Sequence, residues 1–151
     1  MSFRDLVAVV LVLFCSASAY AESTIFNPNK ETTVTLTQDG STLTVSAEGN
    51  GHSETRKIEI QAEKKLRLEI DDFNFDGVKD FAVWHVDDGM GVYTIFRVFV
   101  YKPRVGFFEE QRPACGDEFI NLRVDKKNKL LKSTYYKGNE PTLCITTLSR
   151  K

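Results

Sequence analysis

The residues of this chain that are best suited to chemistry lie in one short acidic segment, residues 72–80, which reads DFNFDGVKD. Side chains with oxygen atoms occupy alternate positions at its start, and a further aspartate ends it. In a tightly wound loop this spacing turns the oxygens toward one centre, where a hard cation such as Ca²⁺ binds. Gly77 follows the third oxygen-bearing residue and permits the positive φ that a reversal of the chain needs. The segment therefore predicts a calcium site whose ligands are the side chains of Asp72, Asn74, Asp76 and Asp80 and the backbone carbonyl of Val78.

The sequence around the acidic segment is not that of an EF-hand. An EF-hand carries a bidentate glutamate at loop position twelve, and Val83 occupies that position here. Residues 66–70 alternate with period two, and residues 81–86 are apolar and partly β-branched, so both flanks are expected to be strands rather than helices. The loop would then join two strands, with Asp80 closing the site in place of the missing glutamate. The alternative is a polar turn that holds no ion.

The first 21 residues have the features of a signal peptide. Arg4 precedes an apolar run at residues 6–14, which is shorter than the roughly 20 residues that a membrane-spanning helix needs. Small residues follow, and cleavage after Ala21 would leave one domain over residues 22–151. No later stretch is apolar and long enough to cross a bilayer, so we expect a periplasmic or secreted protein that does not insert into a membrane.

Charge and cysteine content restrict the class of protein further. The formal net charge is −1, whereas a nucleic-acid-binding domain normally carries a basic face, so no nucleic-acid partner is expected. Removal of the signal segment takes Cys15 away and leaves Cys115 and Cys144, an even number in an exported chain. We expect these two to form a disulfide that closes a loop of about 30 residues and contributes about 3–4 kcal/mol to stability.

The remaining chain reads as a succession of short strands. Residues 33–37 and 42–46 alternate between apolar and polar, and Asp39-Gly40 between them predicts a tight hairpin turn. Residues 48–52 are expected to form a second loop. Further strand signals follow at 57–61, 92–101, 119–124, 130–136 and 143–148. The sequence therefore predicts an all-β, single-domain fold of about eight to ten antiparallel strands. An antiparallel sandwich, a flattened barrel and a partial, propeller-like sheet array all remain open, although no blade repeat is present.

No set of residues in the sequence matches a catalytic apparatus. His52 lies in a glycine-rich loop and His85 in an apolar strand, where structural roles are the simpler interpretation. The adjacent Glu109 and Glu110 would face opposite sides of a strand and could not work as a carboxylate pair. We therefore do not expect an enzyme.

The segment 133–141 is the best candidate for contact with a partner protein. It combines two tyrosines and a lysine with a turn, and a nearby disulfide would limit the conformational entropy lost on binding. An ordinary hairpin with cross-strand tyrosine packing is the alternative. Gly89-Met90-Gly91 forms a second candidate contact loop. The predicted contact residues are Ser133, Tyr135, Tyr136 and Lys137.

Three features in this order resemble a known family: the signal segment, the loop at residues 72–80 followed by Phe81, and the later segment at residues 99–107. The family is that of the periplasmic lysozyme-inhibitor-like immunity proteins, which bacteria keep against secreted peptidoglycan hydrolases. The loop itself is similar to the D-x-N-x-D-G-x-x-D calcium loops of integrin-type propeller repeats. The resemblance implies an all-β fold similar to that of the invertebrate-type lysozyme inhibitors, a bound Ca²⁺, and a loop that plugs the glycosidase cleft.

A second, shorter resemblance concerns the C-terminal segment. Tyr136-Lys137-Gly138 is similar to the Tyr/Trp-x-Lys-Gly element of the chicken-type lysozyme inhibitors. The Ser-Gly-x-x-Tyr motif of such inhibitors is absent, because Thr134 follows Ser133. Together the patterns predict a periplasmic inhibitor or immunity protein that blocks a lysozyme-like peptidoglycan hydrolase. The alternative is a secreted structural or adhesive module that calcium stabilises and that inhibits nothing.

Overall fold

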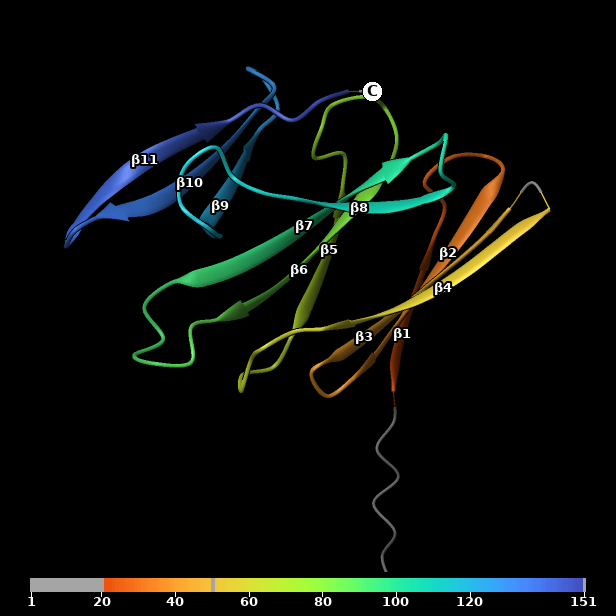
Figure 1. Cartoon of the computed structure of the whole chain (residues 1–151), viewed down its shortest axis with the longest axis horizontal. Coiled ribbons are helices and arrows are strands. Elements are labelled where there is room, and N and C mark those ends of the chain that lie inside the picture. The colour runs from red at the N-terminus through yellow and green to blue at the C-terminus, as the bar shows by residue number, and fades with distance from the viewer. Residues whose placement is uncertain (1–20, 50, 151) are drawn as a thin grey trace, which may run out of the picture.

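The computed structural model describes residues 21–49 and 51–150 as an all-β protein with eleven strands in two sheets (Figure 1). All strand pairs are antiparallel, which confirms the predicted all-β class. Neither sheet closes into a barrel, so of the predicted architectures the structure is consistent with the sandwich. The structure has eleven strands, one more than the upper limit of the predicted eight to ten. The predicted signal peptide lies outside the described residues except for Ala21. Within the described residues, no helix is long and apolar enough to cross a membrane.

The first sheet is a four-stranded meander in the order β1-β2-β3-β4. Tight turns join its longer strands: Asp39 pairs with Thr42 across Gly40, whose φ is +58°. The loop expected at residues 48–52 is shorter in the structure, because Gly49 already pairs with His52. The strand expected at 57–61 accordingly begins earlier. The bounds are β1 Glu22–Phe26, β2 Thr32–Asp39, β3 Thr42–Gly49 and β4 His52–Glu59.

The second sheet has seven strands, six of which follow the order β11-β10-β9-β7-β6-β5. The seventh, β8, pairs with the C-terminal half of β7, whereas β9 pairs with its N-terminal part at Ile95 and Phe96. β9, β10 and β11 therefore diverge from the rest of the sheet and form a separate group of strands (Figure 1). The bounds are β5 Arg67–Asp71, β6 Asp80–Val86, β7 Thr94–Lys102, β8 Phe107–Gln111, β9 Phe119–Asp125, β10 Leu130–Lys137 and β11 Glu140–Thr146.

The main core lies between the two sheets. Alternate residues of β2 and β3 point inward, as the period-two pattern of their sequences predicts. They meet aromatic side chains from the second sheet, where the rings of Phe81 and Phe99 stack with centroids 4.8 Å apart. The buried members of this core are Phe26, Val34, Leu36, Leu43, Val45, Ala47, Ile60, Leu66, Phe81, Val83, Phe99, Tyr101, Phe107 and Phe108.

A second core lies on the opposite face of β6 and β7. Ala82 and Val98 point to this face because they alternate with residues of the main core. Phe119 and Leu131 of the divergent strands cover it, together with Leu148 near the C-terminus. Phe73, from the acidic segment, is fully buried there. The acidic segment is therefore anchored in a hydrophobic core and is not a freely exposed loop.

Candidate functional site

The acidic segment connects β5 to β6, as the sequence predicts. Asp71 pairs with Asp80 across the base of the loop, so the sheet itself holds the two ends together. Phe73 and Asn74 are buried. The Asn74 side-chain amide also donates to the backbone carbonyl of Ser149 at 3.2 Å, which ties the loop to the C-terminal segment.

Hydrogen bonds within the loop wind it around its own carboxylates. The Asp72 carboxylate accepts from the backbone N–H groups of Asp76 at 3.1 Å and of Gly77 at 2.8 Å. Asp76 accepts from the N–H of Val78 at 2.8 Å and from the side-chain amide of Asn74 at 2.8 Å. Gly77 has a φ of +88°, which is the left-handed conformation that the predicted reversal of the chain requires.

Asp80 is the most deeply buried carboxylate of the loop, with no exposed surface. Its two oxygens accept the backbone N–H groups of Phe73 and Tyr101, both at 2.9 Å, and thereby connect the loop to β7. Burial raises the pKa of Asp80 to about 7, because the charged form is poorly solvated, and the neighbouring Asp76 carboxylate acts in the same direction. The two backbone hydrogen bonds oppose this rise in pKa. Among the described residues, no lysine, arginine or histidine forms an ion pair with Asp80.

The donor set of the loop suits Ca²⁺ by its chemistry, because it consists of carboxylate, amide and carbonyl oxygens. Within the described parts of the chain, however, no three histidine, cysteine, aspartate or glutamate side chains are grouped closely enough to hold a metal ion. The hydrogen bond between Asn74 and Asp76 closes the loop on itself. An ion would have to replace that contact, so the calcium site remains a prediction. Val83 is buried in β6, away from any ligand role.

The predicted contact segment is a hairpin formed by β10 and β11. Lys137 pairs with Glu140 across a two-residue turn that begins with Gly138, whose φ is +66°. Ser133 is 3% exposed, so it does not lie on the surface as its predicted contact role requires. Tyr135 is half-buried and lies against Gly116. Tyr136, which is 47% exposed, and Lys137 remain as the surface residues of the predicted set.

The connection between β6 and β7 forms a second projection beside this hairpin. Asp87 is buried and accepts hydrogen bonds from the backbone N–H groups of Gly91 and Val92, which hold the turn in shape. Met90 is 90% exposed at the tip, and Val92 is 68% exposed. The ring of Tyr93 lies 6.4 Å from the ring of Tyr136, centroid to centroid, and joins the two projections.

Part of this second projection could be recognised in the sequence. In the sequence, Gly89-Met90-Gly91 predicts a contact loop, and the adjacent Asp87-Asp88 is typical of an exposed turn or of an extension of the acidic surface. The structure corrects that interpretation for Asp87, which organises the turn from a buried position. Asp88 accepts from the backbone N–H groups of Glu63 and Lys64 and so fixes a neighbouring loop.

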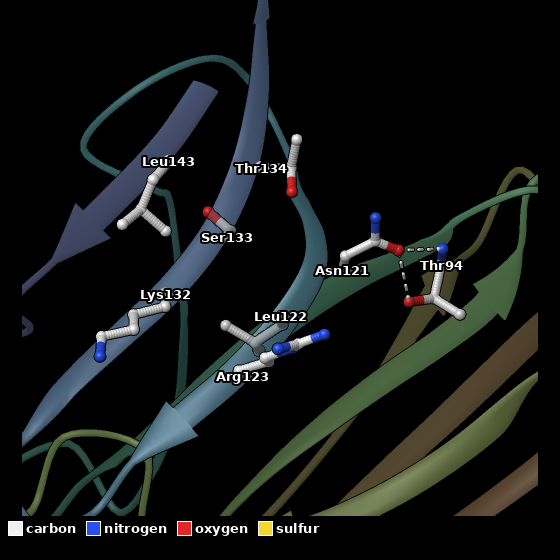
Figure 2. Close-up of a pocket in the computed structure, with 8 residues that line it drawn as sticks. All are labelled: Thr94, Asn121, Leu122, Arg123, Lys132, Ser133, Thr134 and Leu143. Carbon is white, nitrogen blue, oxygen red and sulfur yellow. Dashed lines mark hydrogen bonds between the residues drawn. The ribbon is translucent and has the colours of Figure 1, made fainter. Parts of the chain in front are cut away.

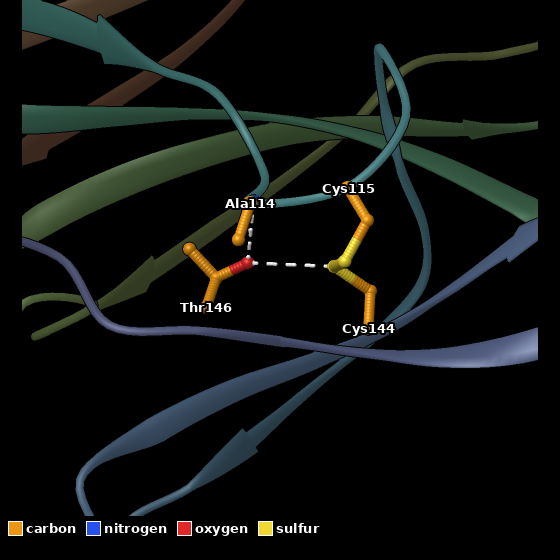
Figure 3. The surroundings of a disulfide bond; sticks show 4 residues. All are labelled: Ala114, Cys115, Cys144 and Thr146. Carbon is orange, nitrogen blue, oxygen red and sulfur yellow. Dashed lines mark hydrogen bonds between the residues drawn. A yellow bond between two sulfur atoms is a disulfide. The ribbon is translucent and has the colours of Figure 1, made fainter.

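A disulfide between Cys115 and Cys144 is present, as the cysteine count predicts, with Cα atoms 5.8 Å apart (Figure 3). Next to it, the backbone N–H of Ala114 donates to the hydroxyl of Thr146 at 2.9 Å. These two contacts fasten β11 to the loop that precedes β9. The loop lies on the buried side of the hairpin, because Cys144 and Thr146 are both buried.

A cavity of about 650 Å³ lies over β7, β9, β10 and β11 (Figure 2). Asn121 has a positive φ of +51° beside an irregularity in the β9–β10 register, and its amide oxygen accepts from the backbone N–H of Thr94 at 3.0 Å. The cavity offers hydroxyls, an amide and two cations but no carboxylate or imidazole that could serve as a general base. Its lining residues are Thr94, Asn121, Leu122, Arg123, Lys132, Ser133, Thr134 and Leu143.

The two histidines lie apart in structural surroundings. His52 is exposed and lies 3.5 Å from Glu54 on the same strand. His85 is buried in β6, with its Nδ1 atom 2.8 Å from the backbone carbonyl of Val86. Glu110 pairs with Arg97 at 2.7 Å, and Glu109 lies 3.8 Å from Lys102.

Comparisons of the chain with protein-family models, curated proteins and solved structures give no match.

Proposed function

We propose that the protein is a periplasmic inhibitor or immunity protein that binds and blocks a lysozyme-like peptidoglycan hydrolase. In this proposal a structural Ca²⁺ is held by Asp72, Asn74, Asp76, Asp80 and the carbonyl of Val78. The proposal combines the sequence resemblance with one structural observation. That observation is a rigid, partly apolar surface formed by the turn at residues 87–93 and the tip of the β10–β11 hairpin, which we call the two-loop surface.

The two-loop surface has the properties of a protein-binding epitope. Its exposed large hydrophobic side chains are Met90, Val92 and Tyr136. Tyrosine is among the residues that contribute most of the binding energy in protein interfaces, and methionine is enriched there. Hydrogen bonds to Asp87 fix one projection, and the short turn at Gly138 fixes the other. Little conformational entropy would therefore be lost on binding.

The shape and charge of the hairpin tip suit the cleft of a glycosidase. Both projections extend from the same end of the molecule (Figure 1), so they can enter a concave partner together. Lys137 is exposed at the tip. Glycoside hydrolases carry a pair of catalytic carboxylates in their clefts, with which a lysine ammonium group can form a charge-assisted hydrogen bond. In the proposal, Tyr136 supplies the apolar contact and Lys137 the ionic one.

Calcium has a stabilising role in this proposal and makes no contact with the target. The acidic loop ends at Asp80, where β6 begins, and the turn at residues 87–93 follows Val86, where β6 ends. A seven-residue strand spans about 20 Å, so the loop and the two-loop surface lie at opposite ends of it. An ion in the loop would offset the repulsion between the buried Asp80 carboxylate and the half-buried carboxylates of Asp72 and Asp76, and would hold β5 against β6.

The test is the lysis of peptidoglycan by a panel of lysozymes and bacterial glycosidases, with the mature protein added. Inhibition of a panel member should be lost in Tyr136→Ala, while the melting temperature stays nearly unchanged. Ile25→Ala is a matched control, because Ile25 is an exposed apolar residue on β1 of the other sheet. Equal inhibition by Tyr136→Ala and by the unmodified protein would refute the two-loop surface. The absence of inhibition across the panel, with stabilisation by Ca²⁺ retained, would favour a calcium-stabilised structural or adhesive module.

A further inference from the structure

The last strand, β11, forms an edge of the seven-stranded sheet. It pairs with β10 along its whole length, and no other strand of the described chain pairs with it. It lies at the outer margin of the molecule (Figure 1). The outward-facing side of an edge strand presents a row of backbone N–H and C=O groups, which can pair with a strand from another chain.

Three other sheet edges, at β4, β5 and β1, carry features that oppose such pairing. β4 has four charged residues along its length, and β5 alternates Arg67, Glu69 and Asp71 with apolar residues. β1 is a short strand of five residues whose first residue, Glu22, lies 3.6 Å from Lys65. Charged side chains and short strands are the common means by which proteins keep sheet edges from associating. These three edges are therefore protected.

β11 has less of this protection: Pro141, beside the turn, has no backbone N–H to offer, but the residues from Thr142 to Thr146 all keep theirs. Its one charged residue is Glu140, beside the hairpin turn, and the chain is then uncharged from Pro141 through Leu148. Leu143 is 62% exposed and Ile145 is 49% exposed on the outer face. On the inner face, the disulfide and the contact to Thr146 hold the strand in place. β11 is thus a pre-ordered and partly apolar edge whose one charged residue lies beside the turn.

We propose that β11 pairs with β11 of a second copy of this chain in an antiparallel, two-fold symmetric dimer. The strand is complementary to itself about Leu143: when Leu143 faces its own copy, Pro141 faces Ile145 and Glu140 faces Thr146. No like charges oppose one another in this register, and the outer face gains a continuous apolar row. A charged strand such as β4 would instead place ions against Leu143 and Ile145, which favours a second β11 over other strands of this chain as the occupant.

The neighbouring strand is compatible with this arrangement. Lys132 of β10 lies beside Ile145 in the register and would be the nearest cation to the joined strands. It is bound to Asp125 at 2.6 Å, so its charge is compensated within the same chain. Two copies can therefore approach along β11 without bringing two unpaired ammonium groups together.

The first test is sedimentation equilibrium of the mature protein, free of its signal segment, over a wide concentration range. We expect a monomer–dimer equilibrium that Leu143→Lys and Ile145→Lys shift fully to monomer, because each places a charge on the joined face. Ile25→Lys introduces the same charge at an exposed position of β1 and should leave the dimer intact. Thermal unfolding shows whether each variant is folded. A monomer at all concentrations overturns the proposal, as does a dimer that persists in folded Leu143→Lys.

A second test fixes the register and does not depend on disrupting the strand. Position 143 faces itself in the proposed dimer, and opposed Cα atoms in antiparallel strands lie about 4.5–5.5 Å apart, which is within reach of a disulfide. Leu143→Cys should therefore cross-link two chains under mild oxidation, as seen by intact mass, whereas Ile25→Cys should not. A dimer that does not cross-link at position 143 would show that another surface associates, and would overturn this assignment.

Discussion

Removal of the disulfide is expected to cost the protein a large part of its stability. The perturbation is the double variant Cys115→Ala, Cys144→Ala, which leaves no unpaired thiol in the mature chain. The bond joins residues 29 positions apart, and in the chain-entropy model a loop of this length contributes about 3.6 kcal/mol at 25 °C. For the 130 residues that follow the signal segment (151 minus 21), this corresponds to a fall in melting temperature of about 13 °C.

Urea unfolding at equilibrium measures this loss, with the reduced wild-type protein as a second way to open the same loop. The unfolded state without the bond is more expanded, so the dependence of stability on urea should become steeper. Hydrogen exchange should show that the amides of β11 lose protection before those of β2 and β3, because the bond fastens β11 locally. A loss below about 1 kcal/mol in both the variant and the reduced protein would refute the chain-entropy reasoning.

Three further predictions address the acidic loop and the divergent strands. Adding Ca²⁺ to chelator-treated protein should raise the melting temperature in differential scanning fluorimetry, and Asp76→Asn should abolish most of this rise. Equal melting temperatures with and without Ca²⁺ would contradict the calcium site. Phe73→Ala should destabilise the protein by about 3–5 kcal/mol in urea unfolding, because Phe73 is fully buried in the second core, and a change within about 0.5 kcal/mol would show that the loop does not anchor there. Hydrogen bonds from Lys132 and Asn128 hold the pKa of Asp125 well below its usual value of 3.8. The charged carboxylate should therefore stabilise the fold fully above pH 3.8, and this stabilisation should be lost as the pH falls from 3.8 toward the pKa of the folded state. Acid unfolding of Asp125→Asn should accordingly depend less on pH in that range, and an unchanged profile would contradict the assignment.

Local patterns in the sequence determined much of the architecture. Period-two alternation and Asp39-Gly40 predicted the β2–β3 hairpin, because strand periodicity and tight turns depend on neighbouring residues. The Cys115–Cys144 pairing also followed from the sequence, since only two cysteines remain after the signal segment. The acidic loop was recognisable from the spacing of its oxygen-bearing residues, and the reversal at Gly77 was predicted from the same segment.

The tertiary structure decided which residues of the predicted contact segment are available. Ser133 and Tyr136 belong to the same strand and both looked suitable for contact, but Ser133 faces the buried side and Tyr136 the exposed side. Strand alternation separates odd from even positions, yet it does not say which face is covered. Which face of the hairpin is covered depends on the loop that the Cys115–Cys144 disulfide fastens to β11, and Cys115 is 29 residues away from Cys144 in the sequence.

The positions of strands relative to one another also came only from the fold. The apolar pattern of residues 143–148 predicts a strand, which lies at residues 140–146 in the structure. Whether this strand is central or at an edge depends on which strands pair with it. The contact between Tyr93 and Tyr136 likewise joins segments that no local pattern relates. The sequence by itself thus determined the strands, the turns and the acidic loop through short-range periodicity and turn chemistry. The two-loop surface and the open edge at β11 arose from long-range pairing.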